Sequence, residues 1–142
     1  MTTQAVDALH EIHTATNDVL KGFREMSARA EPDIQMVLRR LTEMHDRHAA
    51  EQAAELLRFR DAGKDDLSFQ GTVNKVVVMV RDWLTHLDRD TLPAVREGEE
   101  SLRKKYAEAL QDSEVSGAPA IAALFKTQMA EITAQIDQLP QT

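Results

Sequence analysis

The chain has 142 residues, of which 42% are hydrophobic and 29% charged, and its formal net charge is −7 at pH 7. This length and composition predict a single folded domain, residues 1–142, rather than a disordered segment. The negative charge disfavours nucleic acid and anionic membranes as partners, and the absence of cysteine excludes disulfides, thiolate metal sites and a cysteine nucleophile.

The first part of the chain predicts two long helices. Over residues 3–28, apolar side chains recur at steps of three and four, as in an amphipathic helix. Pro32 and Asp33 suit the first turn of a second helix over 32–62, which Gly63 ends. Because the connection is only a few residues long, we expect the two helices to be antiparallel neighbours.

The second part predicts another helix pair. The β-branched run at 73–87 has no second strand to pair with, so we interpret 72–88 as a short crossover helix. Pro93 suits the first turn of a helix over 91–112, and Gly117 with Pro119 separates it from a last helix over 119–139.

These lengths indicate an all-α fold. Two helical hairpins are joined by a long segment that contains one short helix. A four-helix bundle needs such a crossover when its second and third helices run parallel, which is the ferritin-like connection. The prediction is therefore a ferritin-like four-helix bundle with a short fifth helix. The polar N-terminus and the brevity of the apolar run at 76–80 predict a soluble, cytoplasmic protein without a membrane span.

Polar side chains interrupt the apolar faces near the middle of this predicted bundle. The candidates are His13, His45, His48, Glu99 and Glu131, with His48 facing inward and His45 nearer the edge of the core. Buried polar groups need partners, since leaving an amide or hydroxyl unpaired costs roughly 1–3 kcal/mol. Two interpretations stay open: a hydrogen-bonded polar layer, which we favour, or a site for iron, manganese or zinc.

The spacing of these residues limits the metal hypothesis. Ferritin-like di-metal centres use Glu-x-x-His on two helices, and this pattern occurs nowhere in the sequence. The chain instead has His45-x-x-His48-x-x-Glu51. No nucleophile or oxyanion donor accompanies Glu99, so no catalytic residue is predicted and a role without catalysis is favoured.

Short motifs along nearly the whole chain resemble an uncharacterised bacterial family of ferritin-like bundles, described as a domain of unknown function. The matching features are Gly98-Glu99-Glu100, Tyr106 and Glu108-Ala109-Leu110, with "GFREM" (22–26), "AAEL" (53–56), Trp83 and "QMAEI" (128–132). The resemblance implies the ferritin-like fold and no established activity. It also implies a histidine shortly after the Glu-Ile step of the last helix, where this chain has Gln135, Ile136 and Asp137.

The sequence leaves two functions open. The leading hypothesis is a structural, stress-related or protein-interaction role without catalysis, through a protein partner or self-association. The alternative is a metal-binding ferritin-like protein, with oxidoreductase activity as its extension. The apolar segment "VVVMVRDWL" (76–84) in the predicted crossover helix would serve as the contact of a homo-oligomer.

Overall fold

A computed structural model describes residues 3–59 and 92–139 of the chain. These two ranges contain five helices and no strand, which confirms the all-α prediction. The helices are α1 (Thr3–Ser27), α2 (Pro32–Leu57), α4 (Leu92–Gln111), α5 (Ser113–Ser116) and α6 (Pro119–Gln138). None of the helices in these ranges is long and apolar enough to cross a membrane.

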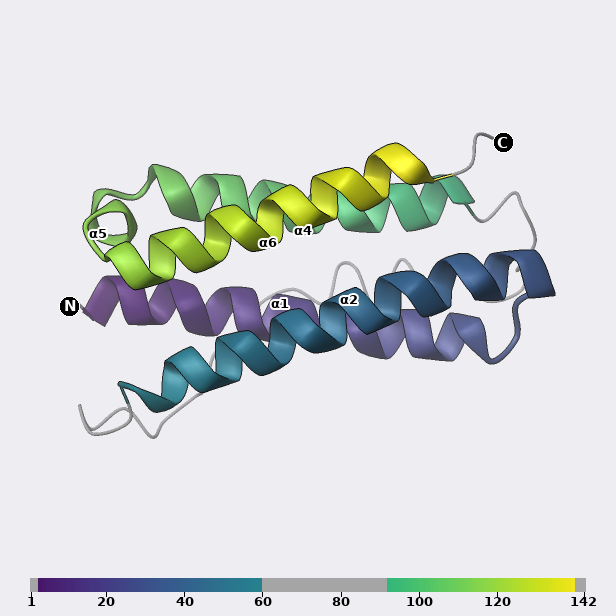
Figure 1. Cartoon of the computed structure of the whole chain (residues 1–142), viewed down its shortest axis with the longest axis horizontal. Helices are drawn as coiled ribbons and strands as arrows, with labels where there is room; N and C mark the ends of the chain where they lie inside the picture. Colours follow the sequence, from purple (N-terminus) through teal and green to yellow (C-terminus); the bar gives the residue numbers. More distant parts are fainter. Residues whose placement is uncertain (1–2, 60–91, 140–142) are drawn as a thin grey trace.

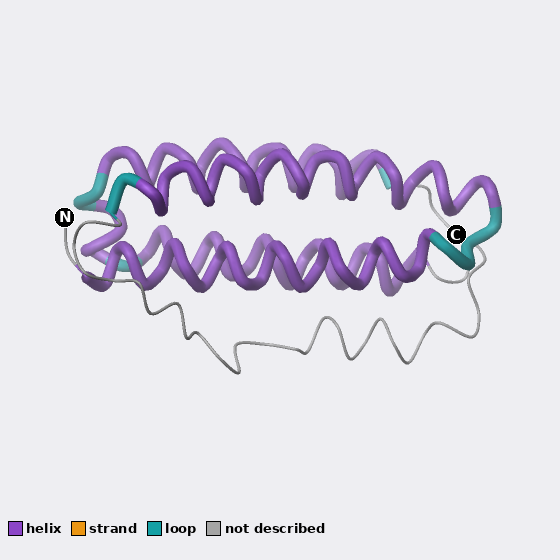
Figure 2. Tube along the Cα trace, turned by 90° about the horizontal axis from the view of Figure 1, so that it is seen from below, coloured by secondary structure: helices purple, strands orange, loops and turns teal. Residues whose placement is uncertain are grey.

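The four long helices lie side by side along one axis (Figures 1 and 2). The pairs α1–α2 and α4–α6 form two antiparallel hairpins, as predicted, and contacts between α1 and α4 and between α2 and α6 join them. In Figure 1, α2 ends at the left side of the molecule and α4 begins at the right. Helices α2 and α4 therefore run in the same direction and occupy diagonal corners.

Proline and aspartate side chains set where several helices begin. Pro32 and Pro119 stand in the first turns of α2 and α6, where a missing backbone N–H costs nothing. The Asp112 carboxylate caps the four-residue helix α5, because it accepts a hydrogen bond from the backbone N–H of Glu114 at 2.8 Å. The sequence reading missed α5 and placed a break there instead.

The predicted helix boundaries agree closely with the structure except at the end of α2. That helix ends at Leu57, rather than at residue 62, because the N–H of Arg58 turns back to the carbonyl of Glu55, three residues away. The predicted crossover helix over 72–88 and its apolar segment 76–84 lie outside the described residues.

One hydrophobic core runs between the helices, and it is built mainly from aliphatic side chains. Phe23, Phe125 and Tyr106 are its large aromatic members, and the rings of Tyr106 and Phe125 pack edge to face at 5.5 Å. The aliphatic members supplied by α1 and α2 include Leu9, Ile12, Val19, Ile34, Leu38 and Leu41, and those from α4 and α6 include Val95, Leu102, Ile121 and Ile132. A row of buried polar residues crosses this core.

Candidate functional site

The most distinctive feature of the interior is a set of buried polar side chains from all four long helices. Six residues of the set are fully buried, namely Thr16 on α1, His45, His48 and Gln52 on α2, Glu99 on α4 and Gln128 on α6. Each of the six has a hydrogen-bond partner. The costs of burying these groups are therefore largely offset by contacts between helices.

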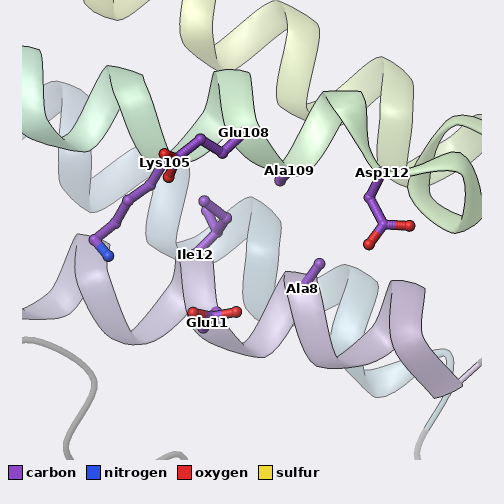
Figure 3. Close-up of a pocket in the computed structure, with 7 residues that line it drawn as sticks. All are labelled: Ala8, Glu11, Ile12, Lys105, Glu108, Ala109 and Asp112. Atoms are coloured by element: carbon purple, nitrogen blue, oxygen red, sulfur yellow. The ribbon is translucent and has the colours of Figure 1, made fainter.

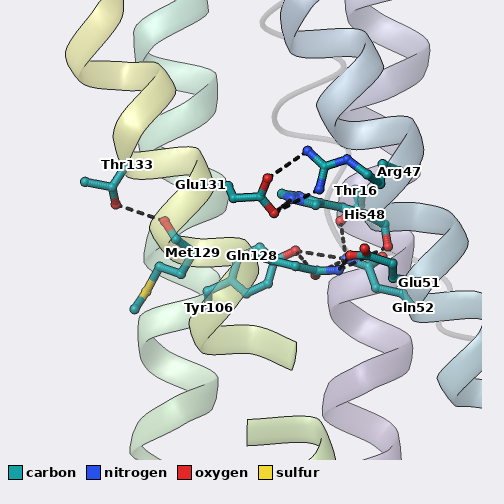
Figure 4. A network of polar contacts seen from close by, with 10 residues as sticks. All are labelled: Thr16, Arg47, His48, Glu51, Gln52, Tyr106, Gln128, Met129, Glu131 and Thr133. Carbon is teal, nitrogen blue, oxygen red and sulfur yellow. Dashed lines mark hydrogen bonds and ion pairs between the residues drawn. The ribbon is translucent and has the colours of Figure 1, made fainter. Parts of the chain in front are cut away.

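Gln52 is the centre of one part of this set. Its side-chain nitrogen lies 2.8 Å from the Tyr106 hydroxyl, 2.9 Å from Gln128 Oε1 and 3.2 Å from Thr16 Oγ1, so its two N–H bonds are shared among three acceptors. The Tyr106 hydroxyl in turn donates to Gln128 Oε1 at 2.8 Å. The amide group of one residue thus links α2 to α1, α4 and α6 (Figure 4).

His13 extends this network toward the surface of α1. Its Nδ1 lies 3.1 Å from Gln52 Oε1, and its Nε2 lies 3.3 Å from the side-chain nitrogen of Asn17. An amide oxygen only accepts and an amide nitrogen only donates, so Nδ1 carries the proton and Nε2 accepts. The buried Gln52 therefore fixes the tautomer of a half-buried histidine.

His45 and Glu99 form a pair that is completely sealed from solvent. Nε2 of His45 lies 2.9 Å from both carboxylate oxygens of Glu99, and both side chains are 0% exposed. A ring N–H donates and a carboxylate oxygen accepts, so this contact is a hydrogen bond from the imidazole to Glu99. Phe23 packs against the imidazole with ring centroids 6.2 Å apart. This pair connects the diagonal helices α2 and α4 through the middle of the bundle.

His48 and Glu131 form a second pair at the edge of the core. His48 Nε2 lies 3.0 Å from Glu131 Oε1, and the Arg47 guanidinium holds both oxygens of Glu131 at 3.0 and 2.7 Å (Figure 4). The hydrogen bonds from Arg47 lower the pKa of Glu131 to about 2. Burial is the main cause that lowers the pKa of His48 below its usual 6.5. His48 is therefore a neutral donor to an ionised carboxylate at pH 7.

Two of these contacts place α2 and α4 in one register. His45 contacts Glu99 and Gln52 contacts Tyr106, and in both pairs the partners are 54 positions apart in the chain. The second contact lies seven residues beyond the first on each helix (45 to 52 and 99 to 106), which is two helical turns. We call these two contacts the diagonal braces. They fix how the two parallel helices are aligned along the bundle axis.

The structure places the five predicted site residues in three separate groups. His45 pairs with Glu99, His48 pairs with Glu131, and His13 contacts Gln52. The prediction that His45 sits nearer the edge was wrong, since its side chain is fully buried. Helix α2 touches α1 and α6 and reaches α4, so its buried face is wider than a single stripe of residues.

Sequence reasoning passed over Gln52, whose amide group hydrogen-bonds to side chains of the other three long helices. A glutamine in a helix is usually exposed, which explains the omission. The signal was a gap in the inward face of α2: Leu56 is the next apolar residue of that face after His48, eight residues or about two turns further along. Gln52 lies midway in this gap, four residues after His48, and continues the inward face.

The ligand chemistry expected of a ferritin-like metal centre is only partly present. Within residues 3–59 and 92–139, no group of three or more histidine and carboxylate side chains is arranged to hold a metal ion. Glu99 and Glu131 each face one imidazole rather than each other. The donors therefore do not fit a di-metal centre with bridging carboxylates, whereas they do fit two hydrogen-bonded pairs.

The stability of the fold is expected to fall as the pH drops below 6.5. The pKa of His48 is lower in the folded protein than in the unfolded chain, so the unfolded chain binds more protons at acid pH. The stabilising contribution of Glu131 is present above pH 4.5 and is lost as the pH falls toward 2. Urea unfolding of wild type and His48→Gln between pH 7.5 and 5 measures the first effect. If the free energy of unfolding changes equally with pH in both proteins over this range, the assignment to His48 is contradicted.

Fold and site together define a class: an all-α bundle whose core is crossed by a hydrogen-bonded polar network. Residues 4–112 match the family described as a domain of unknown function (DUF2383), and because the match spans most of the chain, the protein belongs to this family. The matched range contains the brace residues of α2 and α4, whereas α6, with Gln128 and Glu131, lies beyond it. No curated protein and no solved structure matches the chain.

Proposed function

We propose that the protein is a bundle of ferritin-like connection order that acts without catalysis, as a structural module for a protein partner or for self-association. The parallel direction of α2 and α4 supports the connection order, since it is the arrangement that a long crossover produces. The network around Gln52 carries the argument for the role. The Gln52 amide is hydrogen-bonded to side chains of the other three long helices. The network therefore stabilises the bundle rather than presenting a reactive group.

The two histidine–glutamate pairs support the same interpretation. The proton of His45 Nε2 is held between both oxygens of Glu99 at 0% exposure, where no substrate has access to it. Glu131 is held by Arg47 as well as by His48, so its charge is already compensated. Neither pair combines an exposed base with a nucleophile, the combination that an acid–base site needs.

A second candidate function is binding of iron, manganese or zinc at His45 and Glu99, with His48 beside them. Two observations favour it. The ring nitrogen of His45 is equidistant from both oxygens of Glu99, and the Nδ1 atoms of His45 and His48 are buried without a hydrogen-bond partner in the described part of the chain. The imidazole rings lie edge to face, with centroids 6.0 Å apart.

Metal analysis separates the two functions. Protein purified without a histidine tag is expected to contain no stoichiometric iron, manganese or zinc, and His48→Ala and Glu99→Ala are expected to change stability only. One equivalent of metal in wild type that is lost in both variants would overturn the structural role and establish the metal site. Thr127→Ala on the exposed face of α6 is the matched control, and it should behave as wild type in both measurements.

Self-association has its own test. Light scattering across a dilution series is expected to show a defined oligomer if the segment 76–84 is a contact between copies. A strict monomer at high concentration would contradict self-association through this segment and leave the protein partner as the interaction. The same series at raised salt reports whether the contact is apolar, because an apolar contact is not weakened by screening.

A further inference from the structure

A groove between α1 and α4 combines an apolar floor with charged side chains at its rim. It has a volume of about 210 Å³ and lies where Ala8 and Ile12 of α1 face Ala109 of α4 (Figure 3). The two alanines leave this space because their side chains are short. A drug-sized ligand or cofactor needs about 300 Å³ or more. The groove therefore suits one long side chain rather than a cofactor.

The charges around the groove point to a cationic occupant. Three carboxylates line it, from Glu11, Glu108 and Asp112, against the single ammonium of Lys105. Neither Glu11 nor Glu108 has an ion-pair partner within the described residues, and Lys105 extends toward α1 at one end of the groove (Figure 3). The Asp112 carboxylate is fixed in position, because it accepts from Gln4 at 3.0 Å while it caps α5.

The apolar floor adds a second requirement to the charge. Lysine and arginine bury their aliphatic stems along apolar surface while the charged head reaches a polar rim. The floor of Ala8, Ile12 and Ala109 with a carboxylate rim is complementary to such a side chain, and a simple metal cation would leave that floor uncovered. The net charge of −7 also draws basic segments toward the molecule.

We propose that the groove between α1 and α4 docks an arginine or lysine side chain from a basic segment of a protein partner. The aliphatic stem lies over Ala8, Ile12 and Ala109, and the charged head lies among the carboxylates of Glu11, Glu108 and Asp112. This inference rests on the proposed function, because it describes how the module would contact its partner.

An NMR titration with N-acetyl-arginine amide tests the docking site directly. The amide signals of Ala8, Ile12 and Ala109 are expected to shift, and N-acetyl-norleucine amide, which has the stem without the charge, is expected to shift them far less. Ala109→Leu fills the groove and should weaken binding at least about tenfold through steric exclusion. Ala123→Leu, at an exposed position on α6, is the matched control and should bind as wild type.

A second variant distinguishes a loss of binding from a loss of folding. Glu108→Gln keeps the shape of an exposed side chain and should weaken binding several-fold, with a smaller dependence on salt than wild type. Shifts spread evenly over the acidic surface, or equal binding by Ala109→Leu, would overturn the docking site. That result would not contradict the proposed non-catalytic role, because metal analysis tests that role separately.

Discussion

Replacing His45 by leucine is expected to lower the free energy of unfolding by about 3–5 kcal/mol, because it leaves the Glu99 carboxylate buried without a partner. Both side chains of the pair are 0% exposed, and both oxygens of Glu99 face His45 Nε2. Urea unfolding followed by circular dichroism measures the effect as a lower midpoint with an unchanged slope. A loss below about 1 kcal/mol would contradict a large contribution of the His45–Glu99 contact to stability.

The double variant His45→Leu/Glu99→Met separates the cost of an unpaired charge from the worth of the pair. Exchanging a buried ion pair for apolar residues of similar size is often neutral or stabilising by about 1–4 kcal/mol. The double variant is therefore expected to regain most of the stability that His45→Leu loses. A double variant as unstable as the single one would show that packing around Phe23, rather than charge, sets the cost.

Replacing Gln52 by leucine is the second large effect, expected at about 2–3 kcal/mol, because each buried polar group left unpaired costs about 1–3 kcal/mol. The loss is smaller than the summed cost of all the groups that contact Gln52, because two of them keep another partner. Thr16 still donates to the carbonyl of Ile12, and Tyr106 still donates to Gln128. Thermal and urea unfolding at pH 7.5 measure it.

Gln135→Leu on α6 is the matched control for this variant. Gln135 lies at the half-exposed edge of the bundle, where its side-chain oxygen accepts from Arg40 at 2.9 Å. The same chemical change there is expected to alter stability by no more than about 0.5 kcal/mol, as is usual at surface positions. Equal losses in Gln52→Leu and Gln135→Leu would contradict the central role of the Gln52 amide.

The arrangement of the helices could be predicted because it depends on spacing and length. The periodic apolar residues indicated the four long helices, and Pro32 and Pro119 located where two of them begin. The end of α2 and the short helix α5 were harder to predict from the sequence, because each depends on one local hydrogen bond. Helix ends are set by such single contacts rather than by an average over many residues.

The partners within the polar network could not be predicted in the same way. Periodicity identified Glu99 as a polar residue on an apolar face, and its side chain is fully buried. It could not indicate that Glu99 faces His45, because that choice depends on rotation of α2 and α4 about their axes. Metal binding by His13, His45, His48, Glu99 and Glu131 stays a prediction for metal analysis.

The diagonal braces have a consequence for how this sequence can change over time. An aliphatic core alone permits neighbouring alignments of two parallel helices, one heptad apart, at similar energies. A hydrogen bond has a direction and a fixed reach, so a slip of one turn would break both braces at once. Aliphatic core residues such as Leu38, Leu41 and Leu102 can be replaced by apolar residues of similar volume at modest cost. An insertion between 45 and 52 in α2, or between 99 and 106 in α4, would therefore prevent the two braces from forming together.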